Sequence, residues 1–83
     1  MTNRNLTFGQ AIESLKTGDR VARRGWNGKG MYIFLNNNMG KVIDNGTIQQ
    51  MEPCIVMKTA LGDYQPGWLA SQMDILSEDW EVV

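Results

Sequence analysis

The chain has one cysteine, Cys54, and no histidine, and this scarcity limits how so short a sequence can hold a fold together. A domain of 83 residues buries only about 60% of the surface that its unfolded chain exposes, so its own core is marginal. Small domains often add disulfides, a structural metal or self-association. One cysteine excludes an internal disulfide, and without histidine a zinc site has too few ligands. We therefore expect self-association.

The charge balance and the apolar pattern exclude several classes of partner. Eight Lys and Arg against nine Asp and Glu give a formal charge of −1, whereas binding to long nucleic acids usually requires a strongly basic surface. No apolar run approaches the roughly 20 residues of a membrane span, and the polar start lacks the apolar core of a secretory signal. We expect a cytoplasmic protein, with no nucleic acid polymer and no membrane as partner.

The first element is predicted from capping and periodicity. Thr7 is followed three residues later by Gln10, which is the capping-box pattern. Gly18 is placed to end the helix as its C-cap. Apolar residues recur at helical spacing between these signals: Phe8, Ala11, Ile12 and Leu15. The pattern predicts a helix over about 7–17.

Apolar runs separated by turn residues predict a sheet after this helix. We expect short strands at 20–23, 31–35, 41–43, 54–58 and 80–83. Glycine, asparagine and proline gather in the expected turns and loops, 25–30, 36–40, 44–46 and 62–67. Segment 48–51 fits no single type, and Ser71 with Asp74 resembles a second cap before one helical turn. The fold class is α+β, an N-terminal helix packed on a small antiparallel sheet with a short helical turn near the C-terminus, in one ligand-binding domain, 1–83.

Catalysis is the least expected role. General acid–base catalysis most often uses histidine, and without it neither a Ser–His nor a Cys–His nucleophile can form within one subunit. The carboxylates of Asp74, Glu78 and Asp79 remain, but their setting indicates a helix cap and a solvated surface. Neither glycine-rich phosphate motif, GxxxxGK[ST] or GxGxxG, occurs. We expect no enzyme, no catalytic residue, no metal and no cofactor.

Aromatic rings and cations around the loop 25–30 indicate a binding site. Trp26 and Trp68 fall in polar loops, where an indole can stack on a base with about 1–3 kcal/mol. Groups suited to a small anionic nucleotide surround Trp26: Arg23, Arg24, Asn27 and Lys29. Each feature also has a structural interpretation, since tryptophan can close the edge of a small core and a basic loop can lack a function. Phe8 would either add an aromatic wall or pack inward.

Three segments resemble a known family. They are LTFGQA at 6–11, VARRGWNGKGM at 21–31 and GWLASQMDILSEDW at 67–80. Together they resemble the second type of Thoeris anti-defence protein of bacteriophages, a family long described as a domain of unknown function. The resemblance covers nearly the whole chain, and the RGWNGKG block is specific in combination with the DW ending.

The resemblance implies a function, an assembly and a set of contacts. Such proteins are sponges: they bind glycocyclic ADP-ribose made by a TIR-domain immune protein, and some also bind cyclic dinucleotides, without cleaving them. They are homotetramers, with pockets between subunits, and block Thoeris immunity in the cytoplasm of the infected bacterial host. Matched by motif, Trp26 and Trp68 would face the adenine. Hydroxyl, amide and carboxylate groups would form hydrogen bonds with the ribose or the base, and cations would meet the pyrophosphate. The expected ligand-binding residues are Phe8, Arg23, Arg24, Trp26, Asn27, Lys29, Trp68, Ser71 and Asp74.

One alternative keeps the same residues but assigns no small-molecule ligand. Aromatic and arginine side chains are also enriched at protein interfaces. The chain would then be a structural or protein–protein interaction module, with its tryptophans as core and interface anchors.

Overall fold

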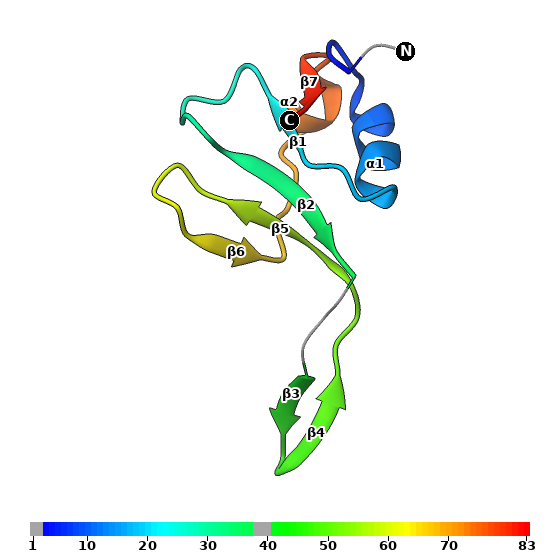
Figure 1. Ribbon diagram of the computed structural model, residues 1–83, viewed down its shortest axis with the longest axis vertical. Coiled ribbons are helices and arrows are strands. Elements are labelled where there is room, and N and C mark those ends of the chain that lie inside the picture. The colour runs from blue at the N-terminus through cyan, green and yellow to red at the C-terminus, as the bar shows by residue number, and fades with distance from the viewer. Residues whose placement is uncertain (1–2, 38–40) are drawn as a thin grey trace.

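The computed structural model describes residues 3–37 and 41–83, and it confirms the predicted α+β class. The elements in chain order are α1 (Phe8–Lys16), β1 (Val21–Arg23), β2 (Tyr32–Asn36), β3 (Lys41–Asp44), β4 (Thr47–Gln50), β5 (Cys54–Lys58), β6 (Tyr64–Pro66), α2 (Gln72–Leu76) and β7 (Trp80–Val82). Figure 1 shows both helices at one end of the molecule and the pair β3–β4 extending away at the other. The chain is accordingly elongated, 46 × 27 × 21 Å.

Five strands form the main sheet, in the order β6-β5-β2-β1-β7. Every pairing within it is antiparallel. The central hairpin joins β2 to β5 with a register from Tyr32↔Lys58 to Asn36↔Cys54. Strands β3 and β4 lie in the connection between these two strands and form a separate two-stranded sheet.

Helix α1 begins as its capping box predicts. Thr7 Oγ1 accepts from the Gln10 amide at 3.2 Å, and Gln10 Oε1 accepts from the Thr7 amide at 2.8 Å. At the other end the C-cap is Thr17, and Gly18 follows it with φ of +96°, a conformation that glycine adopts without steric cost. The helix thus packs Ala11 and Leu15 against the sheet.

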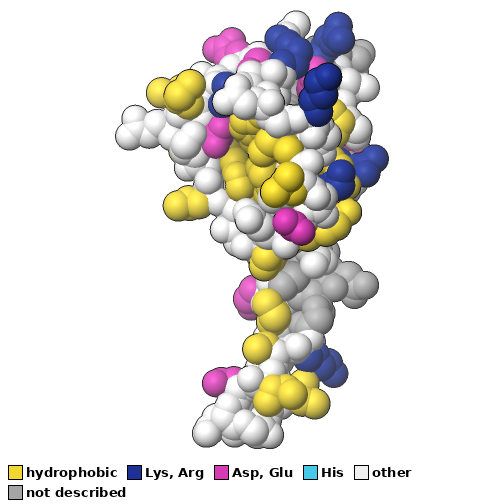
Figure 2. Space-filling model, turned by 90° about the vertical axis from the view of Figure 1, so that its left-hand side faces the viewer, with side chains coloured by type: hydrophobic (Ala, Val, Ile, Leu, Met, Phe, Trp, Pro, Cys, Tyr) yellow, Lys and Arg dark blue, Asp and Glu magenta, His cyan; other side chains and the backbone are white. Residues whose placement is uncertain are grey.

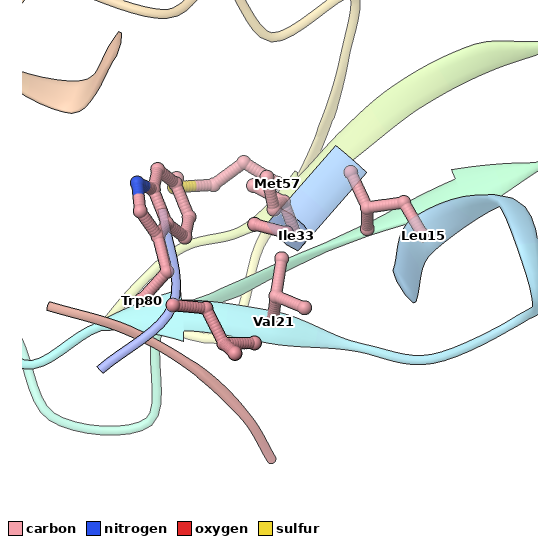
Figure 3. Close-up of a cluster of buried hydrophobic side chains, with 7 residues drawn as sticks. Leu15, Val21, Ile33, Met57 and Trp80 are labelled. Carbon is pink, nitrogen blue, oxygen red and sulfur yellow. The ribbon is translucent and has the colours of Figure 1, made fainter. Parts of the chain in front are cut away.

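The core lies between α1 and one face of the sheet. Leu15, Val21, Ile33 and Trp80 are almost fully buried, and Figure 3 shows their side chains converging with Met57. Burying a side chain of this size contributes about 1.5–3 kcal/mol. The core therefore joins α1 to four strands, and it sets which face of each strand points outward.

One expectation for the strands needs correction, and one segment that the sequence left open is now assigned. The expected loop 62–67 contains β6, which pairs with β5 over three residues from Lys58↔Tyr64 to Val56↔Pro66. The proline in this run obscured the strand, but β6 is an edge strand, where a missing amide donor is tolerated. Segment 48–51, left open, falls mostly in β4.

The predicted turn 44–46 is confirmed in detail, whereas the predicted turn 36–40 lies partly outside the described residues. Asn45 and Gly46 have positive φ, 51° and 79°, as a tight two-residue hairpin turn requires. Of the expected turn 36–40, residues 38–40 lie outside the described residues. Within the described ranges, neither helix has the length and apolar character needed to cross a membrane.

Candidate functional site

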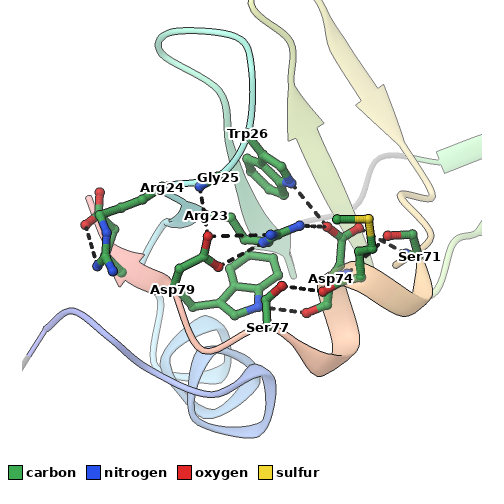
Figure 4. Close-up of polar contacts among 11 residues, drawn as sticks. Arg23, Arg24, Gly25, Trp26, Ser71, Asp74, Ser77 and Asp79 are labelled. Carbon is green, nitrogen blue, oxygen red and sulfur yellow. Dashed lines mark hydrogen bonds and ion pairs between the residues drawn. The ribbon is translucent and has the colours of Figure 1, made fainter.

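The guanidinium of Arg23 lies between two carboxylates near the C-terminus. Arg23 Nη1 donates to Asp74 Oδ1 at 2.9 Å, and Nε donates to Asp79 Oδ1 at 2.9 Å. The side chains of Arg23 and Asp74 are only 10% and 11% exposed, and Figure 4 shows the guanidinium bridging the two acids. This buried ion pair joins β1 to α2 and to the residue before β7.

Asp74 also organises its surroundings. Its Oδ2 accepts from the Ser71 amide at 3.0 Å, and Ser71 Oγ accepts from the Asp74 amide at 3.1 Å, which is the predicted capping box of α2. Its Oδ1 accepts from Trp26 Nε1 at 3.2 Å. One carboxylate therefore fixes the start of α2 and the indole of the glycine-rich loop.

Asp74 takes its predicted place in the cap of α2, but the expectation that Asp79 belongs to a solvated surface is wrong. Asp74 is buried and Asp79 is half-buried, because Arg23 supplies the opposite charge to both. Asp79 Oδ2 also accepts from the Gly25 amide at 2.8 Å. Glu78 alone of the three acids is exposed, as expected.

These contacts shift the pKa values of the two acids downward. Burial by itself would raise the pKa of Asp74, but hydrogen bonds from Ser71, Arg23 and Trp26 outweigh it, so the pKa lies below its ordinary value. The hydrogen bond from Arg23 is the main cause that lowers the pKa of Asp79. Both side chains are therefore ionised at neutral pH and stabilise the folded chain in that form.

Four aromatic rings surround the end of the core. Trp26 and Trp68 meet Trp80 edge-on, at centroid distances of 5.3 and 6.3 Å, and each other at 6.2 Å. Phe8 lies against Trp80 at 5.7 Å. Trp80 is buried while the other three are half-buried. Phe8, Trp26 and Trp68 therefore pack around the edge of the core, and each keeps part of its surface available.

Two glycines in the loop lie where a side chain has no room. A Cβ on Gly25 would stand 2.8 Å from Asp79 Oδ2, and one on Gly28 would stand 2.7 Å from Ala60 Cβ. Because these two positions are glycine, the loop can lie close to Asp79 at Gly25 and close to Ala60, which follows β5, at Gly28.

A cavity of about 470 Å³ opens beside this loop, on the sheet face that turns away from the core. Tyr32 and Lys58 line it and alternate along their strands with the buried Ile33 and Met57. The lining is rich in cations, with one carboxylate: Arg20, Arg23, Arg24, Lys29 and Lys58 against Glu81. Such a composition suits an anion.

Some of these cations are neutralised by carboxylates of the described chain and others are not. Arg23 is held by its two acids, and Arg24 Nη1 lies 3.8 Å from Glu81 Oε1. In the described ranges no carboxylate pairs with Arg20, Lys29 or Lys58. These three side chains supply the net positive charge of the cavity.

Tyr32 lies at the centre of this charge. The guanidinium carbon of Arg20 is 4.7 Å from its ring centroid, and Lys58 Nζ is 5.4 Å from it. Hydrogen bonds with Tyr64 and then with Arg20 lower the pKa of its hydroxyl. A phenol oxygen and two cations are thus presented together on the open face of the sheet.

An aromatic hollow of about 340 Å³ adjoins the cavity, because the two share Arg20 and Tyr32. Phe34 and Tyr64 line it, with their ring centroids 6.2 Å apart at 75°. Basic and aromatic surfaces therefore lie side by side over β1, β2, β5 and β6.

The structure divides the nine predicted ligand-binding residues into groups. Arg23, Arg24, Trp26 and Lys29 line the cavity. Phe8 and Trp68 pack around Trp80, Ser71 and Asp74 form the cap of α2, and Asn27 is exposed in the loop.

Sequence reasoning missed Arg20, Tyr32 and Lys58 as lining residues. A signal for Tyr32 was present, because aromatic residues two apart in a strand, Tyr32 and Phe34, point to one face. Arg20 and Lys58 had no local sequence signal, since only the pairing of β1, β2 and β5 brings them together. Within the described ranges, no three His, Cys, Asp or Glu side chains are grouped to hold a metal ion.

Fold and site together define a small α+β protein with a cation-lined cavity on the open face of its sheet. The model of the Tad2-like, or Thoeris anti-defense 2-like, domain matches residues 6–83. A protein named Thoeris anti-defense 2, from Bacillus phage SP01, is 36% identical over 88 residues, which cover 94% of each chain. The chain therefore belongs to the Thoeris anti-defense 2-like family, and the resemblance found in the sequence is confirmed.

Proposed function

We propose that this chain is a phage anti-defence protein that binds and sequesters a cyclic nucleotide immune signal without cleaving it. The signal is glycocyclic ADP-ribose made by a TIR-domain protein, and the ligand class extends to cyclic dinucleotides. Membership of the family supports the anti-defence role directed at Thoeris. The protein acts in the cytoplasm of the infected host, as a single ligand-binding domain over residues 1–83.

The cation-lined cavity carries this proposal. A chain with a formal charge of −1 gathers three cations there that no carboxylate in the described ranges neutralises, Arg20, Lys29 and Lys58. Its volume of about 470 Å³ lies within the roughly 300–1,000 Å³ of small-molecule sites. Arg and Lys are the natural partners of a pyrophosphate. The anionic part of the nucleotide belongs in this cavity.

Aromatic rings beside the cavity supply the second part of the recognition. Trp26 lines it from the loop, and the hollow formed by Phe34 and Tyr64 adjoins it. A base or ribose that extends from the phosphates reaches these rings on either side. Base–aromatic stacking contributes about 1–3 kcal/mol per base.

Assembly as a homotetramer completes the pocket. The half-buried Trp68 and the exposed Asn27 were matched to the ligand by motif, yet they do not line the cavity of one chain. In an assembly with pockets between subunits, they face the ligand held mainly by another copy. Self-association also suits a chain whose core is small.

Sequestration, and not turnover, fits the chemistry of the side chains. The sequence has no histidine, and the acids Asp74 and Asp79 are committed to Arg23 with lowered pKa values. A general acid at neutral pH requires the opposite shift. A sponge must also compete with the immune effector, so we expect nanomolar affinity, near about −12 kcal/mol.

A binding-and-release assay tests the proposal. The purified protein is incubated with glycocyclic ADP-ribose, free ligand is removed, and the complex is heated and analysed by chromatography. We expect the ligand to return unchanged. A cleaved product would make the protein an enzyme, and failure to bind this ligand or any cyclic dinucleotide would overturn the proposal.

Charge-neutralising variants locate the site. Lys58→Gln or Arg20→Gln removes one unpaired cation, and we expect the Kd to rise about 10- to 100-fold, the loss of one hydrogen bond to a charged group. Lys16→Gln is the matched control, because Lys16 lies exposed on α1 and pairs with Glu13. Equal effects of the three substitutions would show that the cavity is not the site.

A protein–protein interaction module remains the second candidate. Exposed apolar side chains on and before α2 favour it, namely Leu69, Met73 and Leu76. The discriminating variant is Trp26→Ala. Loss of nucleotide binding with an unchanged oligomeric state supports the sponge, whereas loss of association alone supports the interaction module.

A further inference from the structure

A row of side chains crosses the open face of the main sheet and alternates cations with aromatic rings. Lys58 on β5 is the cross-strand partner of Tyr32 on β2 and of Tyr64 on β6. Arg20, which precedes β1, joins the row because its charge lies over the ring of Tyr32. Figure 2 shows lysine and arginine side chains beside hydrophobic ones on the body of the molecule. The order across the sheet is Arg20, Tyr32, Lys58 and Tyr64.

The ring of Tyr32 contacts both charges of this row. The guanidinium carbon of Arg20 lies 4.7 Å from its centroid and Lys58 Nζ lies 5.4 Å from it, within the roughly 6 Å of a cation–π contact. Two cations so close to one point repel each other, and in the described ranges no carboxylate pairs with either. The electron-rich face of the ring therefore keeps them together where no acid does.

The hydroxyl of Tyr32 fixes the ring in turn. It forms side-chain hydrogen bonds with Tyr64 and with Arg20, and these bonds lower its pKa. The bond between the two tyrosines raises the pKa of Tyr64, so Tyr64 donates and Tyr32 accepts. A Cβ on Gly30 would stand 4.0 Å from Lys58 Nζ, which places this ammonium beside the glycine-rich loop. Tyr32 is thus held by its oxygen while its ring meets the two cations.

We propose that Tyr32 is a positioning residue, whose ring holds the charged ends of Arg20 and Lys58 together as a clamp for two adjacent phosphate groups. One cation suffices for a single phosphate, whereas a pyrophosphate spreads its charge over a longer group and gains from two cations held in place beforehand. The clamp makes the cavity selective for nucleotides that contain a pyrophosphate. This inference rests on the proposed function, because it assigns the same cations to the nucleotide.

Inorganic pyrophosphate and inorganic phosphate are the probes, since they carry the bound group without a base or a ribose. In titration calorimetry we expect the unmodified protein to bind pyrophosphate about tenfold more tightly than phosphate. Tyr32→Leu keeps both cations but removes the ring, so this preference should fall to about twofold, a change the size of one exposed cation–π contact. Tyr32→Phe is the matched control: it keeps the ring face, and its preference should stay within about twofold of the unmodified protein.

A double-mutant cycle separates positioning from a general structural role. With glycocyclic ADP-ribose as ligand, Tyr32→Leu should raise the Kd about fivefold in the unmodified protein but about twofold in a Lys58→Gln background, because one of the two positioned cations is already absent there. A purely structural role would give the same factor in both backgrounds. Unchanged emission of the three tryptophans, which pack against one another, shows that each variant is folded.

Four outcomes would overturn the inference: equal affinities of the unmodified protein for the two probes, a Tyr32→Leu variant that keeps the preference, a Tyr32→Phe variant that loses it as fully, or additive effects in the cycle. The proposed function fails in a different way. A protein whose preference for pyrophosphate depends on the ring of Tyr32, but which binds neither glycocyclic ADP-ribose nor any cyclic dinucleotide, would refute the proposed function and leave the clamp intact.

Discussion

Replacing Asp74 by asparagine removes one charge from the centre of the polar network and leaves its shape unchanged. The carboxylate accepts three hydrogen bonds, from Arg23 Nη1, Trp26 Nε1 and the Ser71 amide. An asparagine has one side-chain oxygen, so whichever way it turns, its amide nitrogen faces at least one of these donors. At least one hydrogen bond and the ion pair are therefore lost.

The size of the destabilisation depends on which contacts of Arg23 remain in the variant. Removing one partner of a buried ion pair costs about 3–5 kcal/mol when the other charge is left alone. Here Arg23 keeps Asp79 at 2.9 Å, so we expect a loss of about 2–3 kcal/mol, near the value of one hydrogen bond to a charged group. For a domain of this size, that corresponds to a fall in Tm of roughly 8–24 °C.

Urea unfolding measures this difference directly. The emission of the three tryptophans reports the transition, since all of them pack at or beside Trp80. The protein concentration is kept fixed, because self-association adds to apparent stability. Asp63→Asn is the matched control: it makes the same change at an exposed position after β5, where we expect less than about 0.5 kcal/mol.

A free energy of unfolding for Asp74→Asn within about 0.5 kcal/mol of the parent would refute the reasoning. It would mean that the network is solvated or rearranges without cost. A double-mutant cycle with Trp26→Phe adds a second check, since removing both the indole donor and the charge should cost less than the sum of the single changes.

Three further predictions concern the two acids, the glycine-rich loop and the hydrophobic core. Because the pKa values of Asp74 and Asp79 are lowered on folding, the unfolded chain takes up protons first as the pH falls, so urea midpoints should decrease from about pH 5 downward. Gly25→Ala places a Cβ 2.8 Å from Asp79 Oδ2 and should cost about 1–3 kcal/mol in the same assay. Leu15→Ala leaves a cavity in the core and should cost about 2–5 kcal/mol in the free energy of unfolding.

The fold could be predicted from the sequence wherever a local signal sufficed. Thr7 with Gln10 marked the start of α1, Ser71 with Asp74 marked α2, and Asn45-Gly46 marked the turn between β3 and β4. Each of these signals depends on residues at most three apart. Strand β6 was missed because its assignment depends on β5, a partner that local composition does not reveal.

The site was predicted less completely, for a related reason. The glycine-rich loop identified Arg23, Arg24, Trp26 and Lys29 as neighbours, and these line the cavity. Sequence reasoning could not assign Arg23 to Asp74 and Asp79, because 51 and 56 positions separate them. Arg23, which the sequence predicts to meet the pyrophosphate, is neutralised by two acids of its own chain.

This assignment changes how the charge of the cavity should be understood. Arg23 holds two acids that pin the loop and α2 in place, so the loop cations stand on a rigid support. The unpaired charge comes instead from Arg20, Lys29 and Lys58, one of which lies in the loop and two beside Tyr32 on the sheet. A pocket preformed in this way loses little conformational entropy when it takes up a ligand, which favours tight binding without chemistry. Disrupting Arg23 should therefore weaken binding through loss of order, whereas neutralising Lys58 should weaken it with the fold intact.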